Sequence, residues 1–536
     1  MKVEFRWRKY RYFPYEQRLA RRELAALTRC QPQGHRGGLS VNLEFQWEPM
    51  AARTTYFEAA VPEKGRLIVP LQTLLEASTN IGTSHLVRGS DNKFASRRQS
   101  TRYSSHGLHE YKGKFNPQIV RAVGNVLDLR QGSWILDPFC GSGTTLLEAA
   151  HAGWNAIGVD FNPLAVEIAR AKIAALRVEP HRLLRDARYL TEQLQRRFRR
   201  LSFTRPFSNI EISAVVEDDW EDRLPCIDYL RSWFVPSVLV QLSVTLGAIE
   251  DIANPQVRRI FRVVLSDILR VVSLQDDGDL RIRRRKSPPE NAPAVPLFLE
   301  GVAKRIDLIV RARQVLGRIR TRQYAFVGDS RKLDESLLKH ASVTSHRSFD
   351  AAVSSPPYAT ALPYVDTQRF SLVVLGLTNH KQAGLMQKDL IGTREIGDRQ
   401  RRDLEGAIEE NSANLPRGCA TLCLRLKNAV DSRRDGFRRR NVPALIYKYL
   451  ADMAATFRRV ANVLKPNAPF AIVIGPNRTR LGGRSFLIDT PHLIRLLAEE
   501  NRFETQEILS LNTYQRYDLH RANSIQMEEL ILVRRV

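Results

Sequence analysis

The sequence predicts an α/β fold in which helices cover both faces of a largely parallel, doubly wound sheet. An apolar run at 134–136 leads through a glycine turn into a helical segment, and a second strand at 155–160 is followed by a helix from 163 to about 176. Further strands at 324–331 and 470–475 are separated from these by helical segments. Strands that alternate with helices are typical of a parallel sheet in an α/β domain.

Residues 1–95 are predicted to form a small mixed α+β region at the N-terminus. A basic and aromatic run at 5–15 has strand character, 16–27 has helical character, and 41–47 alternates apolar and polar residues as a half-buried strand does. Arginine and tyrosine interleaved in the first run fit a nucleic-acid contact, but they equally fit an edge strand with solvated arginines. We favour the edge strand.

The next part, residues 96–176, contains the glycine turn Asp137-Pro-Phe-Cys-Gly-Ser-Gly143, after which Thr144 begins a helix. Glycine lets the backbone approach a ligand closely, and a helix start offers unpaired N–H groups. A phosphate-binding P-loop would need a lysine after the turn, and a dinucleotide fingerprint would need a third glycine where Leu146 stands. The following strand ends at Asp160, whose carboxylate can accept two hydrogen bonds from a ribose diol.

A second motif is Phe349-Asp-Ala-Ala-Val-Ser-Ser-Pro-Pro-Tyr358. Two consecutive prolines prevent helix continuation and strand pairing, so the chain must hold a stiff, extended turn. Ser355 supplies a hydroxyl group, Pro356 a carbonyl group, and Tyr358 a flat face on which a base can stack. Alone, the motif would be a proline turn at a strand end. Together with the glycine turn it indicates a binding pocket.

The glycine turn and Asp160 resemble the S-adenosylmethionine (SAM) site of Rossmann-like methyltransferases, particularly those that methylate exocyclic amino groups of nucleic-acid bases. Ser355-Pro-Pro-Tyr358 resembles the (Ser/Asp/Asn)-Pro-Pro-Tyr motif of DNA amino-methyltransferases, and its serine form is most typical of enzymes that act on cytosine N4. The resemblance covers roughly residues 100–176 and 321–536. It implies a class I methyltransferase domain with a seven-stranded sheet and SAM as its cofactor.

The resemblance also implies roles for individual residues. In this family a Lys-Phe-x-Pro segment before the glycine turn packs over the methionine end of SAM, and the residue at Asp329 lies against the adenine. The implied cofactor-binding residues are Lys114, Phe115, Pro117, Asp137, Pro138, Phe139, Gly141, Ser142, Gly143, Thr144, Asp160, Phe161, Asp329 and Ser330. The implied catalytic residues are Ser355, Pro356, Pro357 and Tyr358. Methylation of a ring carbon would instead require a Pro-Cys nucleophile, and a tyrosine follows these prolines.

Residues 177–323 separate the second strand from the third and must be an insertion, which we predict to be mostly helical. Eight apolar residues fall on one face of a helix in it: Val257, Ile260, Phe261, Val264, Leu265, Ile268, Val271 and Val272. Arginines concentrate at 196–200 and 281–286, where they fit either a surface that follows phosphates or an ordinary solvated charge run. The methyltransferase domain would resume at 324–536, with a polar loop at 396–440 over the site.

Composition indicates an anionic macromolecular partner. The chain has 536 residues, and 83 Lys and Arg against 57 Asp and Glu give a net charge of +26. We expect DNA as the partner and RNA less so. The five cysteines lack Cys-x-x-Cys spacing, and His106 and His109 lack a third ligand, so neither a metal site nor a disulfide framework is expected. Without a signal peptide or a run of ~20 apolar residues, we expect a soluble, cytoplasmic protein of open oligomeric state.

Two alternatives remain open. The first is the same chemistry on adenine N6 of DNA or guanine N2 of RNA, because the glycine turn also resembles tRNA guanine methyltransferases. Those enzymes usually carry Asp-Pro-Pro-Tyr, and Ser355 disfavours them. The second is a non-catalytic nucleic-acid-binding protein with a methyltransferase fold, which the intact Gly141, Gly143 and Asp160 disfavour.

Overall fold

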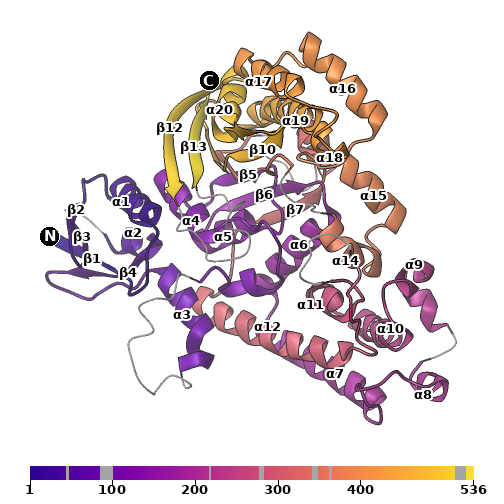
Figure 1. Cartoon of the computed structure of the whole chain (residues 1–536). Coiled ribbons are helices and arrows are strands. Elements are labelled where there is room, and N and C mark those ends of the chain that lie inside the picture. The colour runs from indigo at the N-terminus through magenta and orange to yellow at the C-terminus, as the bar shows by residue number, and fades with distance from the viewer. Residues whose placement is uncertain are drawn as a thin grey trace.

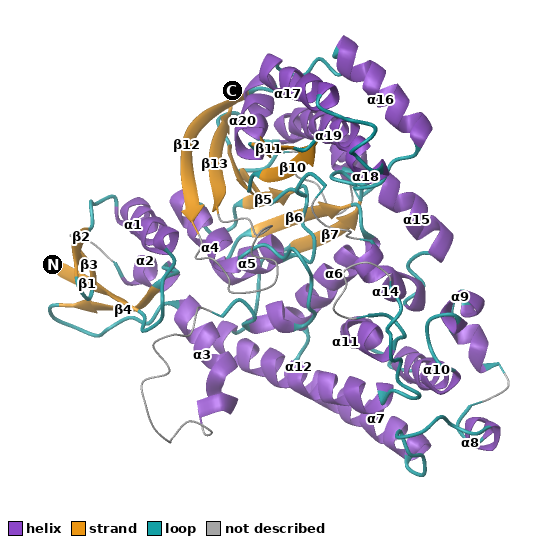
Figure 2. Ribbon diagram, in the orientation of Figure 1, coloured by secondary structure: helices purple, strands orange, loops and turns teal. Residues whose placement is uncertain are grey.

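The computed structural model describes residues 1–43, 47–84, 100–216, 219–276, 283–340, 348–360, 365–512 and 527–536. Figure 1 shows a small N-terminal region, a central sheet between helices, and a group of helices beside the sheet. Figure 2 shows that the strands belong to the N-terminal region and the central part, whereas the group that contains α7 and α12 is helical.

The central sheet has seven strands in the order β12-β13-β9-β8-β5-β6-β7. The strands are β5 (Trp134–Asp137), β6 (Asn155–Asp160), β7 (Gln323–Val327), β8 (Ala351–Ser354), β9 (Pro469–Ile474), β12 (Phe503–Asn512) and β13 (Met527–Arg535). β5 to β9 pair in parallel, and β13 runs antiparallel to both β9 and β12. The predicted seven-stranded, doubly wound sheet is confirmed. Its strand order reverses at β5, and ligands of such sheets bind beside the carboxyl ends of the strands at that point.

Helices bury both faces of this sheet, which explains why its strands are continuous apolar runs. In β9, Phe470 and Ile472 pack with α19 (Val442–Val463) and α20 (Thr490–Glu500). Ala471 and Val473 alternate with them and pack on the other face, with α4 (Pro117–Val126) and α5 (Thr144–Ala152). The alternation of side chains along a strand thus supplies two apolar faces at once.

Two helices near the glycine turn begin with the same Asn-Pro signal. Asn116 accepts a hydrogen bond from the Gln118 N–H at the start of α4, and Asn162 accepts one from the Leu164 N–H at the start of α6 (Pro163–Arg177). A proline at the first helical position has no N–H to satisfy. These caps determine where the segments before and after the glycine turn enter their helices.

The part between α6 and β7 is helical, as predicted. Its elements are α7 (Pro180–Phe198), α8 (Asn209–Ser213), the 3₁₀ helix η3 (Trp220–Arg223), α9 (Ile227–Arg231), α10 (Pro236–Glu250), α11 (Pro255–Val272) and α12 (Ala294–Leu316). The apolar residues predicted for one face of α11 are buried or partly buried, except Val271, which is 49% exposed. The prediction for Val271 was wrong: α11 contacts α6, α10, α12 and α14, so its buried surface is wider than one stripe, and Val263 and Leu269 are buried instead.

The N-terminal region is a mixed α+β unit, as predicted. Its elements are β1 (Lys2–Trp7), α1 (Pro14–Thr28), β2 (Gln33–His35), β3 (Gly38–Asn42), α2 (Glu48–Arg53), β4 (Phe57–Pro62) and α3 (Leu71–Ser84), with an antiparallel sheet in the order β2-β3-β1-β4. The strand predicted at 41–47 was misplaced: β3 ends at Asn42, and residues 44–46 lie outside the described part. The first run of the chain pairs on both of its edges, because β1 lies between β3 and β4, so the predicted edge strand was also wrong.

Residues 396–440 were predicted to be a polar loop, which was wrong. They form α16 (Asp398–Glu410), α17 (Arg417–Asn428) and α18 (Phe437–Arg440). Cys419, Cys423 and Leu426 are buried at helical spacing on the face of α17 that packs on α19. The remaining elements are the 3₁₀ helices η2 (Ser104–Gly107), η4 (Ser330–Lys332) and η5 (Asp366–Gln368), the helices α13 (Leu333–Leu338), α14 (Arg369–Val374) and α15 (His380–Asp389), and the hairpin β10 (Asn477–Leu481) and β11 (Arg484–Ile488).

None of the helices in the described part of the chain combines the length and the apolar composition that crossing a bilayer requires.

Glycine at the end of the turn is needed for space as well as for backbone conformation. Gly143 has φ +82°, and a Cβ atom there would lie 2.7 Å from the Cβ of Ala169 on α6. Gly132 has φ +83°, but a Cβ atom there would meet nothing within 4 Å. We expect Gly132→Ala to cost about 1 kcal/mol of unfolding free energy through its backbone alone. Gly143→Ala should cost about 1–3 kcal/mol more, because it also overpacks the helix contact.

Urea denaturation of the two variants and the wild type measures both costs. Equal destabilisation by the two alanines would show that the contact of Gly143 with α6 does not require glycine.

Candidate functional site

The two sequence motifs meet at the carboxyl ends of neighbouring parallel strands. β5 pairs with β8 so that Leu136 lies opposite Ala352, and both strands end one or two residues later. The Ser354 hydroxyl donates a hydrogen bond of 2.6 Å to Oδ1 of Asp137. Segments more than 200 positions apart in the sequence are therefore joined directly at the point where the strand order reverses.

Hydrogen bonds within the glycine turn hold it in a tight curve. The Phe139 N–H donates to Asp137 Oδ1 at 3.0 Å, and the Gly143 N–H donates to the Cys140 carbonyl at 2.8 Å. Gly141 and Gly143 both have positive φ, and Thr144 is buried at the first position of α5. The turn therefore directs the start of α5, with its unpaired N–H groups, toward the end of the sheet.

Asp160 stands at the end of β6, beside the turn. Its two carboxylate oxygens accept the Gly141 N–H at 2.8 Å and the Asn162 N–H at 2.9 Å. Burial raises the pKa of Asp160 to about 6, although both hydrogen bonds oppose the rise. Burial likewise raises the pKa of Asp137 to about 6, against the hydrogen bond from Ser354. Each carboxylate oxygen of Asp160 keeps a lone pair that can accept a further hydrogen bond, for example from a ribose hydroxyl.

The residues predicted to contact the methionine end of SAM lie on the segment before α4 and at the first position of that helix. Tyr111, which the sequence did not single out, lies 3.7 Å from the position that a Cβ atom on Gly141 would occupy, so this segment passes close to the glycine turn. Lys114 donates to the Thr101 carbonyl at 2.6 Å, and burial lowers its pKa to about 8. Phe115 packs against the core shared with the N-terminal region, and Pro117 is buried at the first position of α4.

The loop after β7 lies against the glycine turn. The buried Ser330 hydroxyl donates to the Pro138 carbonyl, and the Gly328 N–H donates to the Asp160 carbonyl at 3.0 Å. The Asp329 carboxylate forms an ion pair of 2.8 Å with Arg331, whose guanidinium outweighs the effect of burial and lowers the pKa of Asp329. A ligand beside this loop would therefore meet backbone groups more readily than the Asp329 carboxylate. Phe161, which follows Asp160, is half-buried.

In the double-proline corner, Ser355-Pro-Pro-Tyr358, one hydroxyl group has no hydrogen-bond partner among the described residues. Ser355 is half-buried and forms no hydrogen bond with any described residue, whereas Pro356 is buried. The Tyr358 hydroxyl donates to Glu528 on β13, whose pKa burial raises. Gly392 lies against the same corner: a Cβ atom there would come within 2.9 Å of the Tyr358 carbonyl oxygen. No motif or spacing in the sequence connects Glu528 with this corner.

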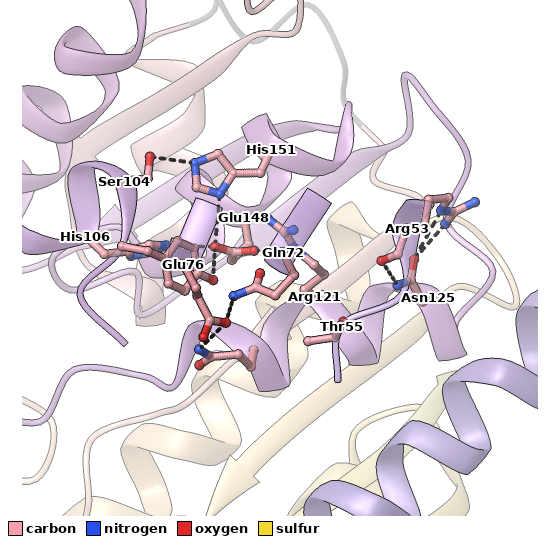
Figure 3. Close-up of polar contacts among 12 residues, drawn as sticks. Arg53, Thr55, Gln72, Glu76, Ser104, His106, Arg121, Asn125, Glu148 and His151 are labelled. Atoms are coloured by element: carbon pink, nitrogen blue, oxygen red, sulfur yellow. Dashed lines mark hydrogen bonds and ion pairs between the residues drawn. The ribbon is translucent and has the colours of Figure 1, made fainter. Parts of the chain in front are cut away.

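A buried polar network fixes the segment before the glycine turn to α5 (Figure 3). Glu148 accepts hydrogen bonds from His106 at 2.8 Å, His151 at 3.1 Å and Arg121 at 2.7 Å, and His151 also contacts the Ser104 hydroxyl at 3.1 Å. Arg121 and the neighbouring groups outweigh burial and hold the pKa of Glu148 well below its usual range. Burial holds the pKa values of His106 and His151 below their usual range.

In this network His106 lies beside Glu148 and His151, two potential metal ligands that the sequence spacing did not indicate. One ligand atom each of His106, Glu148 and His151 lies within 4.8 Å of the others, which is the spacing of a metal site. The carboxylate of Glu148 is nevertheless already occupied by Arg121, by both histidines and by the Tyr103 hydroxyl at 2.8 Å. A guanidinium this close disfavours a second cation, so the donor set fits a hydrogen-bonded core better than a metal centre.

The chain is similar to known DNA methyltransferases. Residues 96–171 match a family model described as DNA methylase. The chain is 23% identical over 325 residues to a type II methyltransferase, M.MjaII, of Methanocaldococcus jannaschii, covering 50% of this chain and 61% of that protein. It is 26% identical over 303 residues to M.MvaI of Kocuria varians, covering 54% and 62%. It is also 35% identical over 81 residues to a tRNA (guanine(10)-N2)-dimethyltransferase of Methanothermobacter thermautotrophicus, covering 15% and 24%.

The chain thus spans about three fifths of the length of the two type II methyltransferases. The family match extends from the segment before α4 through the glycine turn to α6, and it confirms the predicted resemblance to amino-methyltransferases of the N4/N6 class.

The two adjacent serines at the end of β8 should respond differently to alanine. Ser354→Ala removes a buried hydrogen bond to the Asp137 carboxylate and should lower the unfolding free energy by about 1.5–3 kcal/mol. Ser355→Ala removes a hydroxyl group that contacts no described polar group and should change it by less than about 0.5 kcal/mol. Urea denaturation distinguishes them. A larger loss for Ser355→Ala would mean that Ser355 supports the fold.

Proposed function

We propose that this protein is a SAM-dependent DNA methyltransferase that transfers a methyl group to the exocyclic amino group of a base, namely cytosine N4. The observation that carries the proposal is the hydrogen bond between Ser354 and Asp137, which brings the glycine turn and the double-proline corner to one edge of the sheet. Similarity to type II methyltransferases supports DNA as the substrate.

In this proposal the chain holds SAM along the carboxyl ends of β5, β6 and β7, and bound SAM supplies a sulfonium-activated methyl group. Asp160 accepts hydrogen bonds from the ribose diol, and the glycine turn lies against the amino-acid end. The segment with Lys114, Phe115 and Pro117 covers that end. Close approach of two bound reactants in a suitable orientation can lower a barrier by up to ~7–11 kcal/mol, so holding both reactants is most of what the protein must do.

The acceptor side is the double-proline corner. An exocyclic amino group is a poor nucleophile, because its lone pair is delocalised into the ring. Ser355 Oγ and the Pro356 carbonyl accept hydrogen bonds from the two amino N–H groups, which directs the nitrogen lone pair at the methyl carbon. Tyr358 stacks on the base, and its hydrogen bond to Glu528 restricts the position of the ring. No covalent enzyme intermediate is required.

To enter such a site, a base must be unpaired or rotated out of the duplex. The net charge of +26 supports a polyanionic partner. Arg196 and Arg197 are exposed in the last turn of α7, followed by the exposed Arg199 and Arg200. We propose that this cluster contacts phosphates, which positions a duplex without reading its sequence.

Methylation of guanine N2 in RNA is the second candidate. The similarity to a tRNA dimethyltransferase favours it, but that similarity covers only 15% of this chain. Adenine N6 of DNA would use the same chemistry. Incubation with labelled SAM and either duplex DNA or RNA, followed by nucleoside mass spectrometry, separates the candidates. Formation of N4-methylcytosine would support the proposal. Formation of N6-methyladenine or N2-methylguanine would show that the target base is adenine or guanine and not cytosine. Absence of SAM binding in calorimetry would favour a non-catalytic protein.

Removing the Ser355 hydroxyl should separate binding from transfer. We expect Ser355→Ala to bind SAM with unchanged affinity and to transfer the methyl group at least ~100-fold more slowly, since it loses a hydrogen bond that acts on the reacting nitrogen. Asp160→Ala is the matched control and should instead weaken SAM binding. Calorimetry and single-turnover methylation give the two quantities. Full transfer activity in Ser355→Ala would disprove the role of Ser355.

SAM binding should weaken on acidification. The pKa of Asp160 is about 6 in the ligand-free protein, and only the ionised carboxylate accepts both ribose hydrogen bonds. The diol therefore favours the deprotonated form, and the Kd should rise by up to about tenfold per pH unit as the pH falls below about 6. Calorimetric titrations between pH 8 and pH 5 measure this. A smaller pH dependence is expected for Asp160→Asn, and tighter binding of the wild type at pH 5 would contradict the assignment.

A further inference from the structure

A lysine is buried behind the glycine turn without an ion-pair partner among the described residues. Lys172 lies on α6, and its side chain is fully buried. Its Nζ donates a hydrogen bond of 3.0 Å to the Ser142 hydroxyl oxygen, and no described carboxylate forms an ion pair with it. Burying an ammonium group without a counter-ion is strongly unfavourable. Burial accordingly holds the pKa of Lys172 well below its usual range.

Asp267 is the acidic residue whose charge acts on Lys172, and it already has other partners. Asp267 on α11 accepts hydrogen bonds from the Glu110 N–H at 3.0 Å and from Arg305. The charge of Asp267 opposes the fall in the pKa of Lys172 without cancelling it, and Asp267 forms no ion pair with Lys172.

Other groups around the turn also have unused hydrogen-bonding capacity. The Ser142 hydroxyl accepts a hydrogen bond from Lys172 but donates to no described residue, although Ser142 is only 3% exposed. His109 is buried, and neither of its ring nitrogens forms a hydrogen bond in the described part of the chain, although its Nδ1 lies 3.7 Å from Oδ1 of Asp267. Burial lowers the pKa of His109, with Asp267 opposing and Lys172 adding to the fall. These features indicate a place prepared for an anionic or strongly accepting group.

We propose that the Lys172–Ser142 pair binds the carboxylate at the methionine end of SAM: Ser142 donates its hydroxyl proton to the carboxylate, and Lys172 supplies the balancing positive charge behind it. The inference rests on the proposed function. Lys172 is a positioning residue here, because it acts through Ser142.

The orientation of SAM follows from the positions of the charges. Asp160 accepts the Gly141 N–H on the side of β6, where the ribose belongs. Ser142 is the next residue of the turn and is supported from behind by Lys172. The carboxylate is the one negatively charged group of SAM, and an ammonium group without a counter-ion is its natural complement. A carboxylate bound there would turn an unfavourable buried charge into a paired one.

The test compares SAM with decarboxylated SAM, which keeps the sulfonium and the amino group but lacks the carboxylate. The wild type should bind decarboxylated SAM about 10- to 100-fold more weakly than SAM, the range expected for losing a hydrogen bond to a charged group. Lys172→Met should bind SAM about tenfold or more weakly than the wild type does and should bind decarboxylated SAM unchanged. Without ligand, Lys172→Met should be at least as stable as the wild type, because it removes a buried charge.

Two further variants complete the experiment. Ser142→Ala should lose the same preference for SAM, and the double variant Ser142→Ala/Lys172→Met should be no worse than the single variants, because the pair acts as one unit. Lys112→Met, on the exposed surface of the segment before α4, should keep wild-type affinity for both ligands.

Equal affinities of the wild type for the two ligands would overturn the inference. An equal loss of affinity for both ligands in Lys172→Met would also overturn it, because it would indicate a structural role for Lys172. If Lys172→Met does not fold, the wild-type comparison and Ser142→Ala still decide. A wild type that binds neither ligand would refute the proposed function instead.

Discussion

The hydrogen bond between Ser354 and Asp137 is the contact on which the rest of the site depends. It closes β5 against β8 at their carboxyl ends, although a long helical part of the chain stands between these strands in the sequence. That part leaves the sheet after α6 and returns at β7, beside β6, so the parallel order of the central strands is preserved. An insertion placed between β6 and the edge strand β7 can become longer without disturbing the pairing of β5 with β8, the strands that carry the two motifs.

The charges around the glycine turn are distributed by sign. The carboxylates of the buried Asp137 and the half-buried Asp160 lie at the ends of β5 and β6, while Lys172 and Lys114 approach from α6 and from the segment before α4. Burial shifts the pKa of each group toward its neutral form. The same low polarity that makes these groups unfavourable without a ligand strengthens their interactions with a ligand of matching charge. Groups that lower the folding stability of the ligand-free protein at this turn would therefore interact more strongly with a bound ligand.

The fold could be predicted to the extent that local signals agreed with it. Apolar runs such as 470–475 indicate strands from local sequence alone. The Asn-Pro caps of α4 and α6 likewise mark where these helices begin. The order of the elements along the chain then implies the sheet. The helices at 396–440 were missed because α17 offers few buried residues, two of them cysteines. The contacts of Glu148 with His106 and of Tyr358 with Glu528 join distant segments through single side chains. No periodicity or spacing along a single sequence records such contacts.

In the proposed function, the corner formed by Ser355 and Pro356 would determine the chemistry of transfer without determining the base. Cytosine, adenine and guanine all present an amino group with two protons, and two acceptors match each of them equally well. Selection must therefore come from groups that border the ring. Gly392 lies against the Tyr358 carbonyl, and the segment around it joins α15 to α16, so this segment borders the corner. Under the proposed function, this segment would select the base by its size and by the hydrogen bonds at the ring edge, and exchange of the segment would alter the base while leaving the transfer chemistry intact.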